Sequence, residues 1–335
     1  MICIETNRWT RFLCSVTLNH HLASKEACIK LRDTLELLLL SAIWGASFLL
    51  ISLTVQSFPP TWVALIRVTF GSAFLWTVLL AKRRTLPPRR LIVWLLLVAL
   101  FNNAIPFVFF AIGERTVPSS IAAILNATTP IWAVVLSLSF MKQKLEGRTI
   151  PGVLLGFFGV ILVVYSHGAD TSAVRSVHSY AVGILFIALA SAGSAVATVI
   201  AKAKLAGLDP IGLATTQLSL AGLMVLPVAL LGPHPGHVQT KSILAGITLG
   251  IAGSGLAYLL YYSLLDRISS TRVVSVTYLL PIWGLFWGAI AHEHIAAPAY
   301  IGVAIVISGL YLLNRKMPVK EIPVALEVCR PSLDA

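Results

Sequence analysis

Residues 128–135 read TTPIWAVV, and residues 279–286 read LLPIWGLF. The tripeptide Pro-Ile-Trp therefore occurs twice, with Pro130 and Pro281 separated by 151 residues and each embedded in an apolar run. Working outward from these stretches, further features align in the same order at an offset of 150 residues. They include Ser41 with Ser191, Pro60 with Pro210, Gly152 with Gly302, and Gly159 with Gly309. Ordered matches at nearly one offset indicate that the chain holds two copies of one unit.

The composition decides which solvent surrounds these two copies. Of the 335 residues, 57% are hydrophobic and 11% are charged, and the mean hydropathy is +0.88. A water-soluble domain of this length cannot keep so much apolar surface out of water. We therefore expect lipid to surround most of the chain.

Ten apolar runs follow one another, joined by short connections that carry Pro, Gly, Lys or Arg. Each run approaches the roughly 20 residues that cross a hydrocarbon core. Because backbone polar groups in lipid must be satisfied within their own segment, each run is predicted to be a helix. The predicted fold class is an all-α membrane protein with ten transmembrane helices, at about residues 35–55, 61–81, 91–112, 119–140, 150–166, 179–201, 211–231, 243–263, 273–291 and 297–314.

The distribution of charge tests this count of spans. When the connections are assigned alternately, 21 of the 25 Lys and Arg residues fall on one side of the membrane and three on the other, while Arg67 lies inside a span. Positively charged connections stay in the cytoplasm, so both termini are predicted to be cytoplasmic. The net charge of +12 comes from short clusters between apolar runs, so no nucleic acid is expected as a partner.

The number of spans in each copy sets the topology. Five is odd, so the second copy must enter the membrane inverted relative to the first. We expect two inverted five-helix repeats around a central cavity, an arrangement in which transporters bind substrate near the midplane. A duplication that only built a stable bundle is the alternative. The expected organisation is a polar cytoplasmic tail at 1–34, a first repeat at 35–166, an external linker at 167–178, an inverted second repeat at 179–314 and a cytoplasmic tail at 315–335.

The two tails hold all the cysteines of the chain. With cytoplasmic tails, these thiols are expected to be reduced and unpaired. The polar first 33 residues show no apolar core followed by a cleavage site, so no signal peptide is expected. Whether the first 30 residues are a genuine start stays open. The cysteines are Cys3, Cys14, Cys28 and Cys329.

Several stretches carry a family resemblance: WGASFLLISLTV from Trp44, PPTWVALIRVTFGSAFL from Pro59, AIGERTVPSSIAAILNATTPIWAVVLSLSFMKQKL from Ala111, PGVLLGFFGVILVV from Pro151, YYSLLDRISSTRVVSVTYLLPIWGLFWGAIAHEHI from Tyr261 and IGVAIVISGLYLL from Ile301. They resemble the EamA family of the drug/metabolite transporter superfamily, over roughly residues 35–315. The resemblance implies ten helices in inverted repeats, a place in the inner (plasma) membrane, and transport of small metabolites, often by export.

The sequence departs from the family pattern at one place. Members of the family usually carry Glu shortly after the fourth and ninth apolar runs. The second copy has Glu293 there, whereas the first copy has Lys142-Gln143-Lys144. The acidic position is therefore present in the second half alone.

Polar and aromatic side chains inside the spans are the candidates for a substrate cavity. An intramembrane charge is costly, so Arg67 is expected either to bind a substrate carboxylate, to reach the headgroups or to bond to carbonyls across the bundle. Its repeat partner is Gln217. Buried amides either bridge helices or face water, and Tyr261 and Tyr262 are expected in the interfacial aromatic belt. The predicted cavity residues are Trp44, Arg67, Asn103, Asn126, Tyr258 and Tyr278.

Backbone features add candidate hinges and contacts. Pro130 and Pro281 fall in mid-span, where proline removes a helix hydrogen bond and crowds the preceding turn. A kink or break is expected at each, acting as a hinge or substrate site, with a packed kink as the alternative. Small residues spaced by three or four are expected to form helix contact faces, namely Gly152, Gly156 and Gly159, and Gly246, Gly250 and Gly253.

The sequence lacks the residues that a midplane proton relay and the common kinds of enzymatic catalysis need. No Asp or Glu lies well inside a span, which argues against a carboxylate proton relay at the midplane. No phosphate-binding loop, zinc-protease motif or nucleophile elbow occurs. We therefore expect no catalytic residue, no metal and no cofactor. The one candidate cluster is His292-Glu293-His294, at the end of a span.

The leading hypothesis is a secondary transporter that moves a small metabolite, an amino acid or a related compound, by alternating access, with export favoured and no enzymatic activity. Its partners would be that small molecule and membrane lipid, with a homo-oligomer left open. A membrane enzyme acting on lipid is one alternative and would use His292-Glu293-His294. A non-transporting scaffold is the other, although the longest connection between spans is about 12 residues.

Overall fold

The computed structural model describes residues 8–141, 149–168, 177–267, 273, 276–293 and 295–314. It describes side chains from residue 31 onward, except at 137–141, 149, 167–168, 177, 265–266 and 313–314. These residues form helices and short connections, without strands. Within them, seven helical segments are long and apolar enough to cross a membrane: Leu31–Thr54, Pro60–Ala81, Arg89–Gly113, Ser119–Leu136, His178–Lys204, Pro210–Leu231 and Thr240–Leu264. Shorter apolar helices, Ile150–Ser166, Val276–Ile290 and Ala297–Leu312, lie where the other spans were predicted. The all-helical class with apolar spans is confirmed.

The helices follow the predicted runs, but several runs are divided. The first half contains α1 (Arg8–Thr54), α2 (Pro60–Ala81), η1 (Arg89–Leu91), α3 (Ile92–Ala99), η2 (Leu100–Ala104), α4 (Ile105–Gly113), α5 (Ser119–Asn126), α6 (Thr129–Met141) and α7 (Thr149–Gly168). The second half contains α8 (Val177–Lys204), α9 (Pro210–Leu231), α10 (Thr240–Gly250), η3 (Ile251–Leu256), α11 (Ala257–Arg267), α13 (Val276–Ile290) and α14 (Ala297–Asn314).

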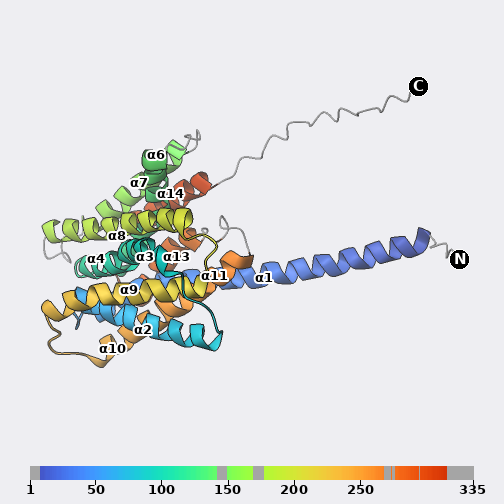
Figure 1. Ribbon diagram of the computed structural model, residues 1–335. Coiled ribbons are helices and arrows are strands. Elements are labelled where there is room, and N and C mark those ends of the chain that lie inside the picture. Colours follow the sequence, from blue (N-terminus) through green and yellow to red (C-terminus); the bar gives the residue numbers. More distant parts are fainter. Residues whose placement is uncertain are drawn as a thin grey trace, which may run out of the picture.

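The first helix is longer than the predicted span. It begins at Arg8 instead of residue 35, and its N-terminal part projects from the bundle (Figure 1). The predicted boundary marked where the sequence becomes apolar, but residues 8–34 contain no Gly or Pro that would stop a helix. We call the end of the bundle where α1 finishes at Thr54 the distal end, and the end where α1 enters at Leu31 the proximal end.

Helices from the two halves interlock. The most extensive packing joins α7 to α14, α2 to α9, α4 to α8 and α1 to α13, and each of these pairs takes one helix from each half. In Figure 1, α2, α9 and α10 lie along one side of the bundle, and α6, α7 and α14 lie along the other. The interface between the halves therefore runs through the whole molecule.

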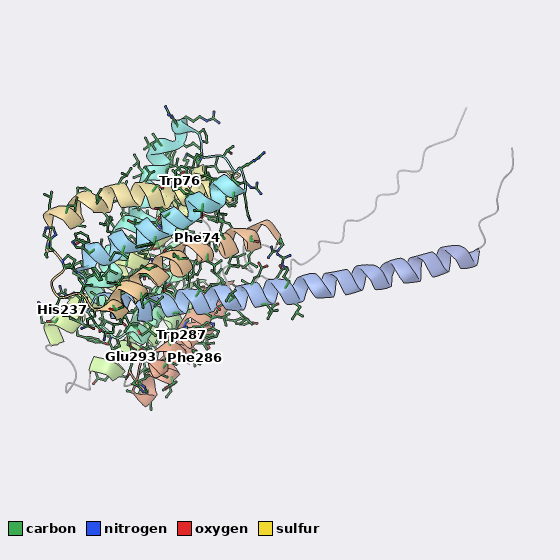
Figure 2. The ribbon with its side chains drawn as sticks, turned by 90° about the horizontal axis from the view of Figure 1, so that it is seen from below. Phe74, Trp76, His237, Phe286, Trp287 and Glu293 are labelled. Atoms are coloured by element: carbon green, nitrogen blue, oxygen red, sulfur yellow. The ribbon has the colours of Figure 1, made fainter. Side chains whose placement is uncertain are left out.

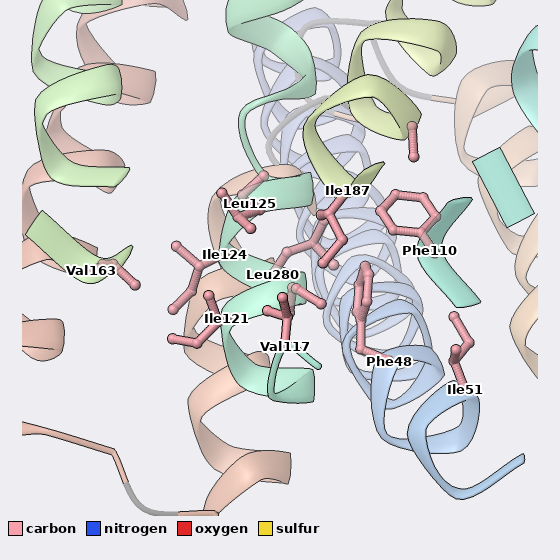
Figure 3. Packing of buried hydrophobic residues seen from close by; sticks show 14 of the residues in the cluster. Phe48, Ile51, Phe110, Val117, Ile121, Ile124, Leu125, Val163, Ile187 and Leu280 are labelled. Atoms are coloured by element: carbon pink, nitrogen blue, oxygen red, sulfur yellow. The ribbon is translucent and has the colours of Figure 1, made fainter. Parts of the chain in front are cut away.

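The short helix α5 lies at the centre of the largest apolar cluster. All its residues from Ser119 to Leu125 are buried. Its Ile121, Ile124 and Leu125 lie between Val163 of α7 and Ile187 of α8 (Figure 3). Helix α5 therefore packs against both halves of the molecule.

Small residues allow two helices to meet backbone to backbone. A Cβ atom on Gly159 of α7 would lie 2.7 Å from the carbonyl oxygen of Gly302 in α14. A Cβ atom on Gly250 of α10 would likewise lie 2.9 Å from the carbonyl oxygen of Arg67 in α2. The prediction that these glycines form helix contact faces is confirmed.

Two segments of the bundle are wound as π-helices. They are η2 in the third predicted run and η3 in the eighth, and their first residues, Leu100 and Ile251, stand 151 residues apart. This is the offset that separates Pro130 from Pro281. Single-turn π-helices frequently mark functional sites. This pair was not among the features predicted from the sequence.

The two mid-span prolines differ in their effect on the helix. The chain turns at residues 127 and 128 between α5 and α6, and Pro130 is the second residue of α6, where its missing N–H costs little. Helix α13 continues through Pro281, so the expected break is absent there. Contacts hold α13 beyond this proline, where Trp283 donates to Ser41 of α1 and Gly284 lies against Ala123 of α5.

Candidate functional site

The π-helical segments each bind a polar side chain from the opposite half. Nε of Arg67 in α2 donates to Oγ of Ser254 in η3, at 2.9 Å. Nδ2 of Asn102 in η2 donates to Oε1 of Gln217 in α9, at 3.4 Å. Arg67 and Gln217 are the residues that correspond between the two copies. We call Arg67, Asn102, Asn103, Gln217, Ser254 and Tyr258 the central polar cluster.

Tyr258 joins the two sides of this cluster. Its hydroxyl oxygen accepts hydrogen bonds from Nδ2 of Asn103, at 3.0 Å, and from Nδ2 of Asn102, at 3.3 Å. Asn103 is fully buried, and its Oδ1 has no hydrogen-bond partner in the structure. A buried acceptor without a donor is costly, so this amide suits a ligand or water that donates a hydrogen bond.

Arg67 is buried but only partly satisfied. The residue is 8% exposed, and its guanidinium lies 3.8 Å from the centre of the Phe107 ring. Within the described part of the chain, its one hydrogen bond uses Nε, and it forms no ion pair. Both terminal nitrogens therefore keep donors that match the two oxygens of a carboxylate.

Trp44 approaches the cluster through a row of aromatic rings. Its ring lies 5.7 Å from that of Tyr261, which is 5.2 Å from Tyr262, which in turn stacks on Tyr258 at 6.1 Å. Tyr261 and Tyr262 are half-buried in this row, and their expected place in an interfacial belt stays a prediction. The tertiary packing of α11 against α1 turns them toward the bundle.

Asn126 and Tyr278 lie outside the central polar cluster. The hydroxyl of Tyr278 donates to the carbonyl oxygen of Leu310 at 2.6 Å and so ties α13 to α14. Oδ1 of Asn126, at the end of α5, accepts a hydrogen bond of 3.3 Å from Thr129. Of the predicted cavity residues, the structure brings together Arg67, Asn103 and Tyr258, with Trp44 at the end of the aromatic row.

Two cavities open at the distal end of the bundle. The first, which we call the distal pocket, has a volume of about 380 Å³ and is lined by Ser52, Val55, Gln56, Glu114, Arg115, Thr116, Val117, Pro118, Ser119 and Glu293. The second has a volume of about 490 Å³ and shares Val55, Gln56 and Arg115 with the first. None of the predicted cavity residues lines either pocket.

Glu293 closes one wall of the distal pocket by binding the start of α5. Its carboxylate accepts hydrogen bonds from the backbone N–H of Ser119, at 2.8 Å, and of Ser120, at 3.0 Å. It also accepts from the two serine hydroxyls, at 2.7 and 2.6 Å. The first N–H groups of a helix lack partners within the helix and favour an anion. The sequence feature that could have predicted this contact is Pro118-Ser119-Ser120 directly before an apolar run.

The end of α13 aims Glu293 at this position. His292 has a φ of 57°, in the left-handed region where glycine usually ends a helix. The N–H of His292 donates to the carbonyl of Ala289, and the N–H of Glu293 donates to that of Gly288, at 3.0 and 2.9 Å. Figure 2 shows Glu293 near Trp287, in the half of the bundle away from the projecting part of α1.

Glu114 lines the same pocket in a contrasting environment. It is 6% exposed, and neither of its carboxyl oxygens has a hydrogen-bond partner of standard geometry. Glu114 follows the last residue of the span Arg89–Gly113. Burial raises the pKa of its carboxyl well above the ordinary value, repulsion from Glu293 adds to the rise, and attraction to Arg67 opposes it.

Ion pairs join helices at the proximal end. Arg267 of α11 bonds to Asp33 of α1, with Nε 3.1 Å from Oδ1, and pairs with Glu36 as well. Arg84, which follows α2, lies 3.4 Å from Asp209 at the start of α9. The described structure thus has both cavities at the distal end, where Glu293 also joins the two halves, and ion pairs between the halves at the proximal end.

Comparison with known proteins settles the family. A model of the EamA-like transporter family matches the chain twice, over residues 34–165 and 181–315. The chain belongs to this family. The resemblance found in the sequence is therefore confirmed, and this EamA-family protein is a multi-pass membrane transporter.

Several relatives of this EamA-family protein carry transporter names. An "Uncharacterized transporter" of Archaeoglobus fulgidus is 23% identical over 85% of this chain and 100% of that protein. "Uncharacterized transporter YvbV" of Bacillus subtilis is 24% identical over 86% and 93% of the two chains. "Protein PecM" of Dickeya dadantii is 23% identical over 81% and 89%. One crystal structure superposes with a TM-score of 0.61 at 21% identity, covering 84% of this chain and 96% of the other, and supports the fold.

The enzyme alternative requires the cluster His292-Glu293-His294, but Glu293 has a structural role in the fold. Both carboxylate oxygens of Glu293 bind the start of α5, and His292 is exposed. His294 lies outside the described residues, as do Lys142, Gln143 and Lys144. Among the described residues, no group of three His, Cys, Asp or Glu side chains could hold a metal ion. The family and the names of its relatives indicate a transporter instead of an enzyme.

Proposed function

We propose that this protein is a secondary transporter that exports an amino acid, or a related small carboxylate, by alternating access. The observation that carries the proposal is that the central polar cluster contains both Arg67, bonded to Ser254, and Asn103, bonded to Tyr258. Arg67 keeps guanidinium donors for a carboxylate, and Asn103 keeps a buried acceptor oxygen for an ammonium group. An amino acid presents both partners on one small molecule.

The energetics of burial support a ligand at this position. A cation inside a span is costly unless it is paired, and the described structure offers Arg67 no ion pair. Specific recognition in a largely apolar site needs only a few convergent polar groups. The aromatic row from Tyr258 to Trp44 supplies an apolar wall for a side chain.

The proposed architecture is ten spans in two inverted five-helix repeats around a central substrate cavity. The double match of the family model and the paired π-helices support a repeat. The distribution of 21 Lys and Arg residues on one side supports cytoplasmic termini in an inner (plasma) membrane. With this orientation, the distal end faces outward.

The same orientation supports an outward-facing conformation. The distal end carries both pockets, whereas the proximal end carries the pairs of Arg267 with Asp33 and Glu36. Transport would then require the proximal contacts to open as the distal pockets close. The hinge role of Pro130 belongs to this proposal, supported by the break between α5 and α6.

The test is efflux from liposomes that contain the purified protein and are loaded with a mixture of the common amino acids. Mass spectrometry of the external solution identifies the compounds that leave. We expect selective efflux, and Arg67→Gln should slow it about tenfold or more, because a hydrogen bond to a charged group contributes roughly 1.5–3 kcal/mol. Arg67→Lys should not restore the rate, since lysine lacks the planar pair of donors.

The matched control is Arg84→Gln, which removes an arginine near the proximal end of the same helix. Arg84 is 55% exposed in its pair with Asp209, so the control should transport at the native rate. If folded native protein moves neither amino acids nor simple organic acids, the proposed substrate class is wrong. If Arg67→Gln transports normally, the substrate carboxylate binds elsewhere.

A further inference from the structure

The distal pocket contains a carboxyl group that the proposed substrate site does not use. Glu114 is more than nine-tenths buried, both of its oxygens lack hydrogen-bond partners of standard geometry, and it lines a cavity of about 380 Å³. A carboxylate in such surroundings is costly, and protonation removes the charge. The cavity gives this group a path to water at the distal end.

We propose that Glu114 is a proton-binding site, and that its proton is exported together with the substrate carboxylate held by Arg67. This inference rests on the proposed function. It leaves the expectation against a carboxylate relay at the midplane unchanged, because Glu114 acts from the end of its span.

The two glutamates of the distal pocket, Glu114 and Glu293, have different roles. Glu293 accepts four hydrogen bonds from Ser119 and Ser120, which hold its carboxylate against the start of α5. Glu114 receives none of these four hydrogen bonds, has only the backbone of Ser52 as a hydrogen-bonding group to favour its ionised form, and faces the negative charge of Glu293. The proton therefore belongs on Glu114, while Glu293 holds α5 in place.

The charged and titratable neighbours of Glu114 define its two states. From α2, Arg67 attracts it, across the pocket Glu293 repels it, and Arg115, next in the chain, is exposed to solvent. From α8, the phenol of Tyr180 belongs to the adjoining apolar cluster, and α1 contributes the uncharged Ser52. The cation available to an ionised Glu114 inside the bundle is thus Arg67.

This arrangement couples the proton to the substrate. When Glu114 holds a proton, Arg67 is free to bind the substrate carboxylate. When the proton leaves through the distal pocket, the Glu114 carboxylate attracts Arg67 and competes with the substrate. Loss of the proton to the outside therefore promotes release of the substrate on that side, and the two move in one direction.

The test is proton movement during amino-acid efflux from the same liposomes. A pH-sensitive dye outside the vesicles reports protons, and potassium with valinomycin holds the membrane potential constant. We expect the external solution to acidify in step with efflux, close to one proton for each amino acid. Glu114→Gln should keep efflux and lose the acidification, whereas the matched variant Glu293→Gln should keep both.

The outcomes separate this inference from the proposed function. Efflux without acidification in native protein, or acidification that persists in Glu114→Gln, overturns the inference and leaves the transporter proposal standing. Efflux that requires sodium at constant pH also overturns it, because the site would then hold sodium. Absence of efflux for every amino acid overturns the proposed function. The proposed coupling of the proton to the substrate is then overturned as well.

Thermal unfolding in detergent tests the proton site without any substrate. A carboxyl with a raised pKa in the folded chain contributes stability that is full below its ordinary pKa of about 4.3 and is lost as pH rises through the folded value. The Tm of native protein should therefore fall relative to that of Glu114→Gln as pH increases. A Tm difference that does not change with pH overturns the assignment of the proton to Glu114.

Discussion

Glu114 and Glu293 line one cavity, yet their surroundings set their chemistry apart. Both carboxylate oxygens of Glu293 accept hydrogen bonds from the N–H and hydroxyl groups of Ser119 and Ser120. Among the described residues, neither oxygen of Glu114 has a hydrogen-bond partner of standard geometry, so a negative charge there is costly. At the scale of the residue, the identity of a side chain matters less than the donors that the fold places around it.

Glu293→Ala should destabilise the protein by roughly 2–3 kcal/mol, because charge-assisted hydrogen bonds and the capping of α5 are lost together. Glu293→Gln should lose less, since its amide oxygen still accepts. The measurement is the free energy of unfolding in mixed detergent micelles. A double-mutant cycle with Ser120→Ala is the control, and independent effects of the two changes would show that this contact does not stabilise the fold.

The pairing of α7 with α14 depends on glycine at the scale of the element. A Cβ atom on Gly309 would lie 2.6 Å from the backbone nitrogen of Gly156, and one on Gly159 would lie 2.7 Å from that of Val306. Backbone atoms cannot turn aside as side chains can. In lipid, where apolar burial does not drive helices together, such close packing supplies much of the attraction.

Gly159→Ala should therefore destabilise the protein by about 1–3 kcal/mol, the usual range for overpacking. The matched control is Gly222→Ala in α9, where the added Cβ atom would lie 3.6 Å from Cγ2 of Val68, an ordinary contact. This control should be neutral or stabilising by up to about 1 kcal/mol, because alanine favours the helix. Equal unfolding temperatures for both variants would contradict the role of close packing.

At the scale of the whole molecule, two corresponding contacts differ. Nε1 of Trp283 donates to Oγ of Ser41 at 2.9 Å, which joins α13 to α1. The corresponding residues of the other copy are Trp132 and Ser191. Among the described residues, Nε1 of Trp132 has no hydrogen-bond partner, and Ser191 donates to the carbonyl of Ile187 at 3.0 Å, much as Ser41 donates to that of Leu38 at 2.8 Å. One contact of the pair is made and the other is broken.

If the two copies exchange conformations during transport, these contacts should exchange as well. Trp283→Phe removes the contact present in the distal-open state, and a neutral hydrogen bond of about 1 kcal/mol shifts the balance roughly fivefold. We expect slower labelling of Gln56→Cys at the distal end by a membrane-impermeant thiol reagent. Trp132→Phe should not slow it. The native cysteines lie in the tails, and equal effects of both variants would contradict the exchange.

The sequence by itself determined the properties that depend on local composition. The length and apolarity of the runs predicted the helices, and ordered matches around Pro130 and Pro281 predicted the duplication that the family model matches as two segments. Arg67 was a candidate because a charge inside an apolar run is visible without any structure. These predictions succeed because hydration and lipid solvation act on each segment separately.

Tertiary structure alone decided which residues meet. Ser119 and Glu293 are separated by 174 residues, and Arg67 and Ser254 by 187, so no local pattern pairs them. The same holds for the π-helical turns of η2 and η3 and for the continuous helix α13 at Pro281, which the sequence patterns did not predict. The physical reason is that burial and hydrogen bonding are properties of neighbours in space, and the fold chooses those neighbours.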